Sequence, residues 1–258
     1  MARTCAFCPA DAVEHGGEHI WDDWLNRRLP SKKFAVQTRL SPKDPFRVFA
    51  RKNLNLKLPV VCAECNNTWM SDITNEISKG FADAIIHGSE LSILPSGSEL
   101  LSAFTFMKAV VADCVTQGDN DELFFSTAAR ENIRKSRSAP PTAQMWISSF
   151  YGKRRYGGRF ISGLLVPGPG PLFGLEFFIF TYVVGHLVLQ LLGVRWKDVR
   201  LRWQPLPVLK PDAYWNTAVS RFCPNDGFPV KWPLKHLGDD ALKTFTDRFN
   251  APIELRIP

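Results

Sequence analysis

The longest regular pattern of apolar positions runs from Glu99 to Cys114. Hydrophobic side chains recur there three or four residues apart, at positions 100, 101, 104, 107, 110, 111 and 114. This spacing places them on one face of a helix, and Ser98 stands where an N-cap residue is expected. Shorter helices are expected after Ser126 and from Asp239 to Phe249.

Beyond Pro141 the pattern changes to β-branched and aromatic runs separated by turn residues. The runs that predict strands are Gln144–Tyr151, Gly158–Val166, Leu175–Val184 and His186–Val194. The Pro-Gly repeat from Pro167 to Pro171 predicts a loop between two of them. This half of the chain therefore predicts an antiparallel sheet.

One part of this region also has the length of a membrane span. From Phe177 to Val194 there are 18 residues without Asp, Glu, Lys or Arg, close to the minimum for a transmembrane helix. Gly185-His186 lies in the middle of the run, however, and Gln190 is polar. These residues favour a buried β-hairpin, and we expect no membrane segment.

Small and polar residues between His87 and Ser98 predict a domain boundary. We expect an N-terminal domain over residues 1–85 and a second domain over residues 98–258. Helices and strands together predict an α+β fold. No motif in residues 98–258 indicates what the second domain does.

Composition narrows the class of protein. Of 258 residues, 45% are hydrophobic and 22% are charged, which excludes disorder, a collagen-like repeat or a coiled coil for the chain as a whole. Six cysteines are too sparse for a disulfide scaffold. No apolar run follows Arg3 as it would in a secretory signal. We therefore expect a cytoplasmic protein.

Basic residues are concentrated in one early segment. The whole chain carries a formal net charge of +7, whereas Arg27 to Lys57 alone holds ten basic residues and one acid, Asp44. A solvated loop can have this composition, but so can a surface that contacts phosphates. We expect a phosphate-contacting loop or β-hairpin. Its candidate nucleic-acid-binding residues are Arg27, Arg28, Lys32, Lys33, Arg39, Arg47, Arg51 and Lys52.

Two Cys-x-x-Cys pairs, Cys5–Cys8 and Cys62–Cys65, flank this basic segment. A tight turn points both sulfurs of a pair to one side, so two pairs can complete a tetrahedral zinc site. A redox dithiol is the alternative, but it needs only one pair beside a strand-to-helix pattern. The sequence therefore predicts a structural Zn²⁺ held by all four thiolates. We expect Cys114 and Cys223 to be core or incidental residues.

Polar residues near the two pairs complete a recognisable order. Glu18-His19 follows the first pair, and Asn66 follows the second pair directly, where a helical pattern begins. This order of Cys pair, acidic–His pair, basic stretch and Cys pair with Asn resembles the HNH endonucleases. The resemblance covers residues 1 to about 80 and does not extend to the rest of the chain.

The resemblance implies a ββα-metal unit with a definite chemistry. His19 would be the general base, while Glu18 and Asn66 would bind a catalytic Mg²⁺ or another divalent cation. Hydrolysis of a phosphodiester needs a base for the attacking water and a cation for the charge on the leaving oxygen. The zinc would fasten the strand that carries Glu18 and His19 to the helix that begins at Asn66.

The chain departs from the family's pattern at three positions. Glu18 stands where Asp is commoner, and Asn66 where His is. The Asn that orients the base usually lies nine residues before the helix residue, where this chain has Lys57. Asn55 is our candidate for that role, and Asn53 is the other one nearby.

Two classes of function remain. The first is a metal-dependent HNH-type endonuclease whose partner is nucleic acid, with double-stranded DNA favoured over RNA. The second is a zinc-knuckle module that binds nucleic acid without catalysis, in which His19 is a core residue beside Ile20 and Trp21. The set of Glu18, His19 and Asn66 favours the enzyme.

Overall fold

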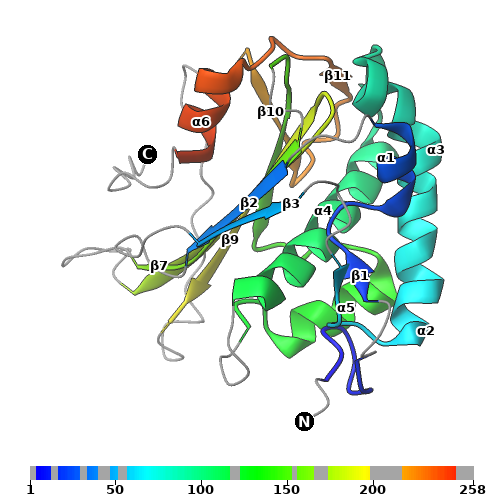
Figure 1. Cartoon of the computed structure of the whole chain (residues 1–258), viewed down its shortest axis with the longest axis vertical. Coiled ribbons are helices and arrows are strands. Elements are labelled where there is room, and N and C mark those ends of the chain that lie inside the picture. Colours follow the sequence, from blue (N-terminus) through cyan, green and yellow to red (C-terminus); the bar gives the residue numbers. More distant parts are fainter. Residues whose placement is uncertain are drawn as a thin grey trace.

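The computed structural model describes residues 4–12, 17–29, 34–39, 47–51, 57–116, 123–152, 156–165, 174–197 and 217–247. They form a mixed fold of helices around one large sheet (Figure 1). Its seven strands lie in the order β10-β6-β9-β8-β7-β2-β3. Their bounds are β2 Phe34–Arg39, β3 Arg47–Arg51, β6 Ala143–Ser149, β7 Tyr156–Leu165, β8 Leu175–Val184, β9 Leu187–Trp196 and β10 Val219–Cys223.

Two short strand pairs lie outside the large sheet. β1 (Glu18–His19) pairs antiparallel with β4 (Lys57–Leu58), and β5 (Leu91–Ile93) pairs antiparallel with β11 (Val230–Trp232). The helical elements are α1 Asp23–Arg28, α2 Ala63–Cys65, η1 Asn66–Met70, α3 Ser71–His87, α4 Pro95–Thr116, α5 Thr127–Ser136 and α6 Asp239–Asp247. η1 is a single wide turn that connects α2 to α3 across a kink at Thr68.

The predicted hairpin in the apolar run is confirmed. β8 and β9 are antiparallel neighbours in the middle of the sheet, and every residue of β8 is buried. Alternate residues enter two different clusters, with Phe178, Phe180 and Tyr182 on one face and Phe177 and Ile179 on the other. A strand covered on both faces needs no polar alternation, which explains the continuous apolar sequence. In the described part of the chain, no helix has the length and apolar character to cross a membrane.

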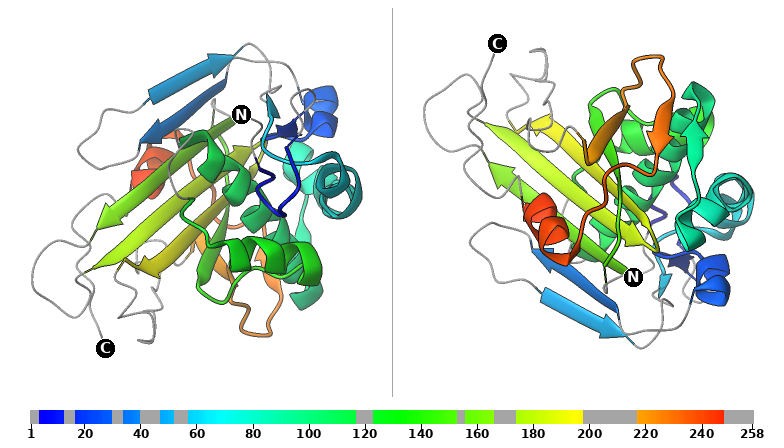
Figure 2. Two further views of the ribbon diagram at one scale, coloured as in Figure 1. Left: turned by 90° about the horizontal axis from the view of Figure 1, so that it is seen from below. Right: turned by 90° about the horizontal axis from the view of Figure 1, so that it is seen from above.

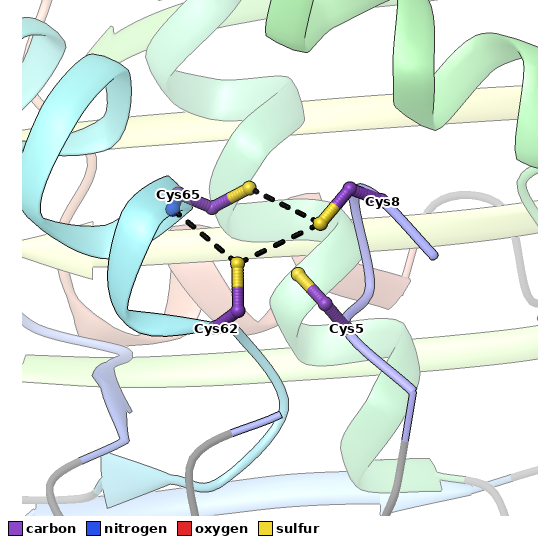
Figure 3. A group of neighbouring side chains, drawn as sticks. All are labelled: Cys5, Cys8, Cys62 and Cys65. Carbon is purple, nitrogen blue, oxygen red and sulfur yellow. Dashed lines mark hydrogen bonds between the residues drawn. The ribbon is translucent and has the colours of Figure 1, made fainter. Parts of the chain in front are cut away.

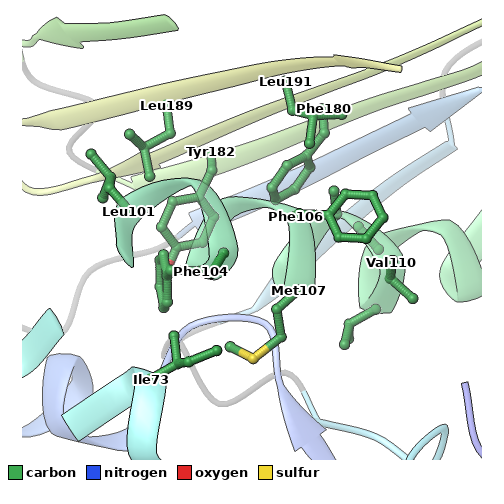
Figure 4. Packing of buried hydrophobic residues seen from close by; sticks show 14 of the residues in the cluster. Ile73, Leu101, Phe104, Phe106, Met107, Val110, Phe180, Tyr182, Leu189 and Leu191 are labelled. Carbon is green, nitrogen blue, oxygen red and sulfur yellow. The ribbon is translucent and has the colours of Figure 1, made fainter. Parts of the chain in front are cut away.

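The two faces of the sheet are covered by different helices. α6 packs on one face, where Phe245 joins the cluster of Phe177 and Ile179. α4 crosses the other face, with α3 and α5 beside it (Figures 1 and 2). Figure 4 shows the α4 side chains wedged between sheet residues such as Phe180 and Tyr182 and Ile73 of α3.

The helix predicted from Glu99 to Cys114 is confirmed, but its start is not. α4 begins at Pro95, so Ser98 lies inside the first turn and is completely buried. Proline suits the first helical position, because an N–H at that position has no hydrogen-bond partner within the helix and its absence costs nothing. The helix predicted after Ser126 is capped as expected, because Ser126 Oγ accepts a hydrogen bond from the N–H of Ala129.

The turn between β8 and β9 fastens the sheet to α3. Gly185 has φ +57°, and a Cβ at this position would lie 2.1 Å from the backbone oxygen of Ile85. The adjacent N–H of His186 donates to that same oxygen at 2.8 Å. Glycine is therefore required here both by the backbone conformation and by the close approach of α3.

The basic segment enters the large sheet. β2 and β3 pair antiparallel, which confirms a hairpin within residues 27–57, and β2 also pairs parallel with β7. The prediction of a loop or hairpin is wrong for Arg27 and Arg28, which end the helix α1. A buried cluster includes Phe7 and Trp21 from the N-terminal part together with Phe104 and Phe180 from the later part. The division into domains 1–85 and 98–258 stays a prediction, while the core draws on both sides of it.

Candidate metal centre and the Glu18–His19 strand

The four cysteines of the two Cys-x-x-Cys pairs meet in one cluster. Figure 3 shows Cys5 and Cys8 on the N-terminal segment, with their sulfurs turned toward Cys62, which directly precedes α2, and Cys65, which ends it. All four sulfurs lie within 4.8 Å of one another, and all four residues are buried. The predicted grouping is therefore confirmed for residues that lie more than 50 positions apart in sequence.

The cluster has the dimensions of a tetrahedral metal site. Four ligands at the usual zinc–sulfur distance of about 2.3 Å place neighbouring sulfurs about 3.8 Å apart. Cys8 Sγ lies 3.6 Å from Cys62 Sγ and 3.8 Å from Cys65 Sγ. The cysteines are free thiols rather than disulfides. The donor set and its spacing thus fit a four-thiolate zinc site.

Local backbone bonds turn the sulfurs inward. Cys5 Sγ accepts from the N–H of Phe7 at 3.5 Å, and Cys62 Sγ accepts from the N–H of Cys65 at 3.4 Å. Burial opposes ionisation of Cys62, but the bond from the Cys65 amide lowers the pKa of its thiol. Burial raises the pKa of Cys65 and of Cys8. A cation bound by the cluster would favour the thiolate form of both.

The two Cys-x-x-Cys turns, Cys5–Cys8 and Cys62–Cys65, together form what we call the knuckle. Side chains from α5 and η1 contact the knuckle from outside. Arg130 donates to the carbonyl oxygen of Ala6, between the first two cysteines. Arg134 pairs with Glu64, between the second two, at 2.8 Å. Trp69 packs edge-on against Phe7 with ring centroids 5.0 Å apart. An aromatic pair therefore packs directly beside the cysteine cluster.

The strand that carries Glu18 and His19 lies beside the knuckle. Glu18 is opposite Leu58, and His19 is opposite Lys57 in the β1–β4 pair. Gly17 precedes the pair with φ +47°, and a Cβ there would lie 2.5 Å from the Leu58 oxygen. Only a residue without a side chain allows the two strands this approach. The cross-strand neighbour of His19 is Lys57. In the HNH endonucleases that the chain resembles, the Asn that orients the base usually stands at this position.

A buried ionic cluster lies under this strand. Lys108, on α4, donates to Glu18 Oε1 at 2.6 Å, to the His19 carbonyl oxygen at 2.8 Å and to Asp22 Oδ1 at 2.6 Å. Lys108 is 1% exposed, Asp22 5% and Glu18 6%. Burial lowers the pKa of Lys108, but Asp22 and Glu18 raise it above its ordinary value, so the ammonium stays charged. Burial raises the pKa of Asp22, and Lys108 counteracts this.

The other predicted site residues are placed as follows. Asn66 is the first residue of η1, half-buried, and its N–H donates to the Cys62 carbonyl oxygen at 3.1 Å. His19 is also half-buried. Glu18 and His19 thus share β1, while Asn66 belongs to the knuckle that β4 leads into. Asn55 lies outside the described residues.

The basic candidates are described to different extents. Arg27 is exposed at the end of α1 and pairs with Asp23 at 3.0 Å. Arg28 lies over the Trp24 ring at 5.9 Å. Arg39 ends β2, and Arg47 and Arg51 begin and end β3. Lys32, Lys33 and Lys52 lie outside the described residues.

Comparison with known proteins adds no relative: no family model, curated protein or solved structure matches the chain.

Lys108 and Asp22 complete the ionic cluster around Glu18, and no motif in the sequence points to either residue. Lys108 follows Phe104 by four positions and precedes Val111 by three, which places it on the apolar face of α4. A lysine on a buried face needs a charged partner. The sequence therefore indicated a buried ion pair, but it did not indicate which carboxylates complete it.

Proposed function

We propose that this protein is a metal-dependent endonuclease of HNH type that hydrolyses phosphodiester bonds, in DNA rather than RNA. The observation that carries the proposal is the order of elements around the four cysteines. β1 with Glu18 and His19 pairs antiparallel with β4, and β4 leads through Cys62 and Cys65 into Asn66 and the long helix. This is the strand–strand–helix order that the family resemblance implies.

In this proposal the four thiolates hold one structural Zn²⁺. The zinc fastens the N-terminal segment to the start of the helix, and its role is to fix the position of β1. His19 is the general base that accepts a proton from the attacking water. Glu18 and Asn66 would hold the catalytic divalent cation, which supplies positive charge to the leaving oxygen when bound.

The state of Glu18 is compatible with that role. Lys108 bonds to its Oε1, and the second carboxylate oxygen takes no part in that bond. Carboxylates that bind a metal through one oxygen are commonly held by a hydrogen bond at the other. Asp22 adds a second negative charge beside Lys108, so the cluster of two carboxylates and one ammonium carries a formal −1.

The substrate is assigned from charge. The β2–β3 hairpin and its flanking residues carry most of the chain's excess positive charge. Duplex DNA presents a dense row of phosphates that such a segment can neutralise. We therefore assign the basic segment to contacts with the phosphate backbone of DNA. The Glu18–His19 strand is assigned to the hydrolysis of the phosphodiester bond.

A second candidate is a zinc-knuckle module that binds nucleic acid without cutting it. It is favoured by the burial of Glu18 and Asp22 against Lys108, where the ammonium supplies the positive charge that a metal ion would supply. It is also favoured by Lys57, which lies opposite His19 where the family has Asn.

Cleavage of supercoiled plasmid by the zinc-loaded protein separates these candidates. We expect nicked and linear products with added Mg²⁺ or Mn²⁺ and none without a divalent cation. His19→Ala should lower the rate about 10²–10⁴-fold, because it removes the base, while DNA binding and zinc content stay as in the wild type. His87→Ala, which changes an exposed histidine at the end of α3, is the matched control and should cut normally.

Other outcomes have distinct meanings. Binding without cleavage under every divalent cation would contradict the nuclease and support the binding module. Neither binding nor cleavage would contradict both.

A further inference from the structure

We propose that Lys108 is a positioning residue for the Glu18–His19 strand. It acts through that strand and does not touch the substrate. The inference depends on the proposed function for its kinetic consequence, but its structural content, the fixing of His19 by a residue of α4, stands independently. Neither the cysteine pairs nor the acidic–His pair points to this residue.

Three hydrogen bonds hold the Lys108 ammonium in a single arrangement. A lysine ammonium has three N–H donors and no acceptor. Lys108 directs them to three oxygens, those of Glu18, His19 and Asp22, at 2.6, 2.8 and 2.6 Å. Because Lys108 is 1% exposed, water does not compete for these donors. The ammonium therefore fixes a side chain and a backbone carbonyl in β1 at the same time.

The three acceptors span the whole connection from β1 to α1. Glu18 and His19 form β1, and Asp22 is the residue immediately before α1. Asp is a preferred N-cap residue, yet the Asp22 side chain makes no cap bond to α1. Its carboxylate is directed to Lys108 and also accepts from Thr74 Oγ1 of α3 at 3.4 Å. Lys108 thus holds both ends of the segment that carries His19.

Stability alone does not require a charge at this place. Replacing a buried ion pair or triad with apolar residues is often neutral or stabilising, because desolvation offsets the attraction between the charges. Phe104, Val111 and Ala112 are apolar neighbours of Lys108 on α4, and the Phe104 ring lies 5.6 Å from its ammonium. An apolar cluster would fill this space. The ionic triad instead gives β1 a defined position relative to α4, which lies some 90 residues later in the chain.

The consequence for the reaction is specific. A base displaced by about 1 Å can lose about 10²-fold in rate without loss of substrate affinity. The hydrogen bonds of Lys108 go to Glu18, His19 and Asp22 and not to the residues proposed to contact phosphates, so removing Lys108 should lower kcat and leave KM unchanged. The His19 ring should also change its environment, because its own backbone carbonyl loses a donor.

The experiment compares zinc-loaded wild type, Lys108→Met and Lys108→Arg, with Lys79→Met as the control on the exposed face of α3. Lys108→Arg keeps a charge for the two carboxylates, so we expect it to fold even where Lys108→Met does not. Plasmid cleavage gives kcat and KM, elemental analysis gives zinc content, and ¹H–¹³C correlation spectra report the histidine rings. We expect kcat to fall about 10²-fold in Lys108→Met and less in Lys108→Arg, with KM and zinc unchanged. The His19 signals should shift in both variants, while those of His87 and His236 should not.

Each remaining result decides the matter. Unchanged His19 signals and kcat in folded Lys108 variants would overturn the inference. So would loss of zinc or of cooperative unfolding in both variants, because Lys108 would then serve the fold alone. If the wild type does not cut DNA, the proposed function fails, and the shift of the His19 signals still supports or overturns the positioning role.

Discussion

Asp113 is a carboxyl group that the fold keeps away from water. It is completely buried on α4, and its Oδ2 accepts from the N–H of Phe124 at 2.7 Å and of Phe125 at 3.4 Å. Burial raises the pKa of Asp113 to about 7, although these two amide bonds counteract the rise. The folded protein therefore binds a proton at Asp113 more tightly than the unfolded chain does.

This difference predicts a pH dependence with a definite sign. The ordinary pKa of Asp113 is 3.8 and its folded pKa is about 7. The stabilisation is complete below pH 3.8 and is lost as pH rises through about 7. Relative to Asp113→Asn, the free energy of unfolding of the wild type should fall by up to about 1.4 kcal/mol per pH unit over that interval. Urea titrations of both proteins between pH 5 and 8 measure it, and a constant difference would contradict the assignment.

Single residues also show how far sequence reasoning reaches. The four cysteines were grouped correctly because the chemistry of two Cys-x-x-Cys pairs is nearly independent of the rest of the fold. Lys108 is different. Its position on an apolar helix face signals a partner, but Glu18 and Asp22 become that partner only through the packing of α4 under β1. Such a contact depends on tertiary arrangement, which local pattern does not specify.

At the scale of elements, periodicity predicted most helices and strands of the later part of the chain. β6, β8, β9, α5 and α6 lie close to their predicted bounds. The β2–β3 hairpin was expected, but its parallel pairing with β7 was not. The two strands are separated by more than 100 residues, and nothing in the basic segment indicates which edge of a sheet it joins. Hairpins follow from local sequence, whereas the order of strands in a sheet does not.

The turn between β8 and β9 gives a prediction at this scale. Gly185→Ala should destabilise the protein by about 2 kcal/mol or more, because it combines a positive φ with a collision against the backbone of Ile85. Gly80→Ala is the matched control, since a Cβ at Gly80 in α3 meets nothing within 4 Å. That change should stabilise the protein by roughly 0.5–1 kcal/mol through helix propensity. Chemical denaturation of both variants measures the contrast, and equal effects would show that the turn does not pack on α3 as described.

For the whole molecule, the knuckle, the helices and the sheet share buried contacts. Phe7 lies between two of the cysteines, and it belongs to the same hydrophobic cluster as Phe104 of α4 and Phe180 of β8. Arg130 and Arg134 of α5 add polar contacts to both halves of the knuckle. The spacing of the cysteines predicted a zinc site, and the periodicity of apolar residues predicted an α+β fold. Neither pattern indicated that the cysteine turns pack into the same core as α4 and β8. We therefore expect a metal bound by the four cysteines also to stabilise the hydrophobic cluster that α4 shares with Phe7.

The central claim is that the four clustered cysteines hold one zinc ion, and metal content tests it most directly. Native mass spectrometry and elemental analysis of the purified protein should find one zinc per chain. Cys62→Ser should lose it, because three thiolates cannot complete the site. Cys114→Ser should keep it, because Cys114 does not belong to the cluster of four cysteines, and a serine hydroxyl can replace the bond of its thiol to the Val110 carbonyl oxygen. The account predicts a stoichiometry of one that depends on Cys62 and not on Cys114. Zinc-free protein with four reduced thiols, or a disulfide within either Cys-x-x-Cys pair, would contradict it.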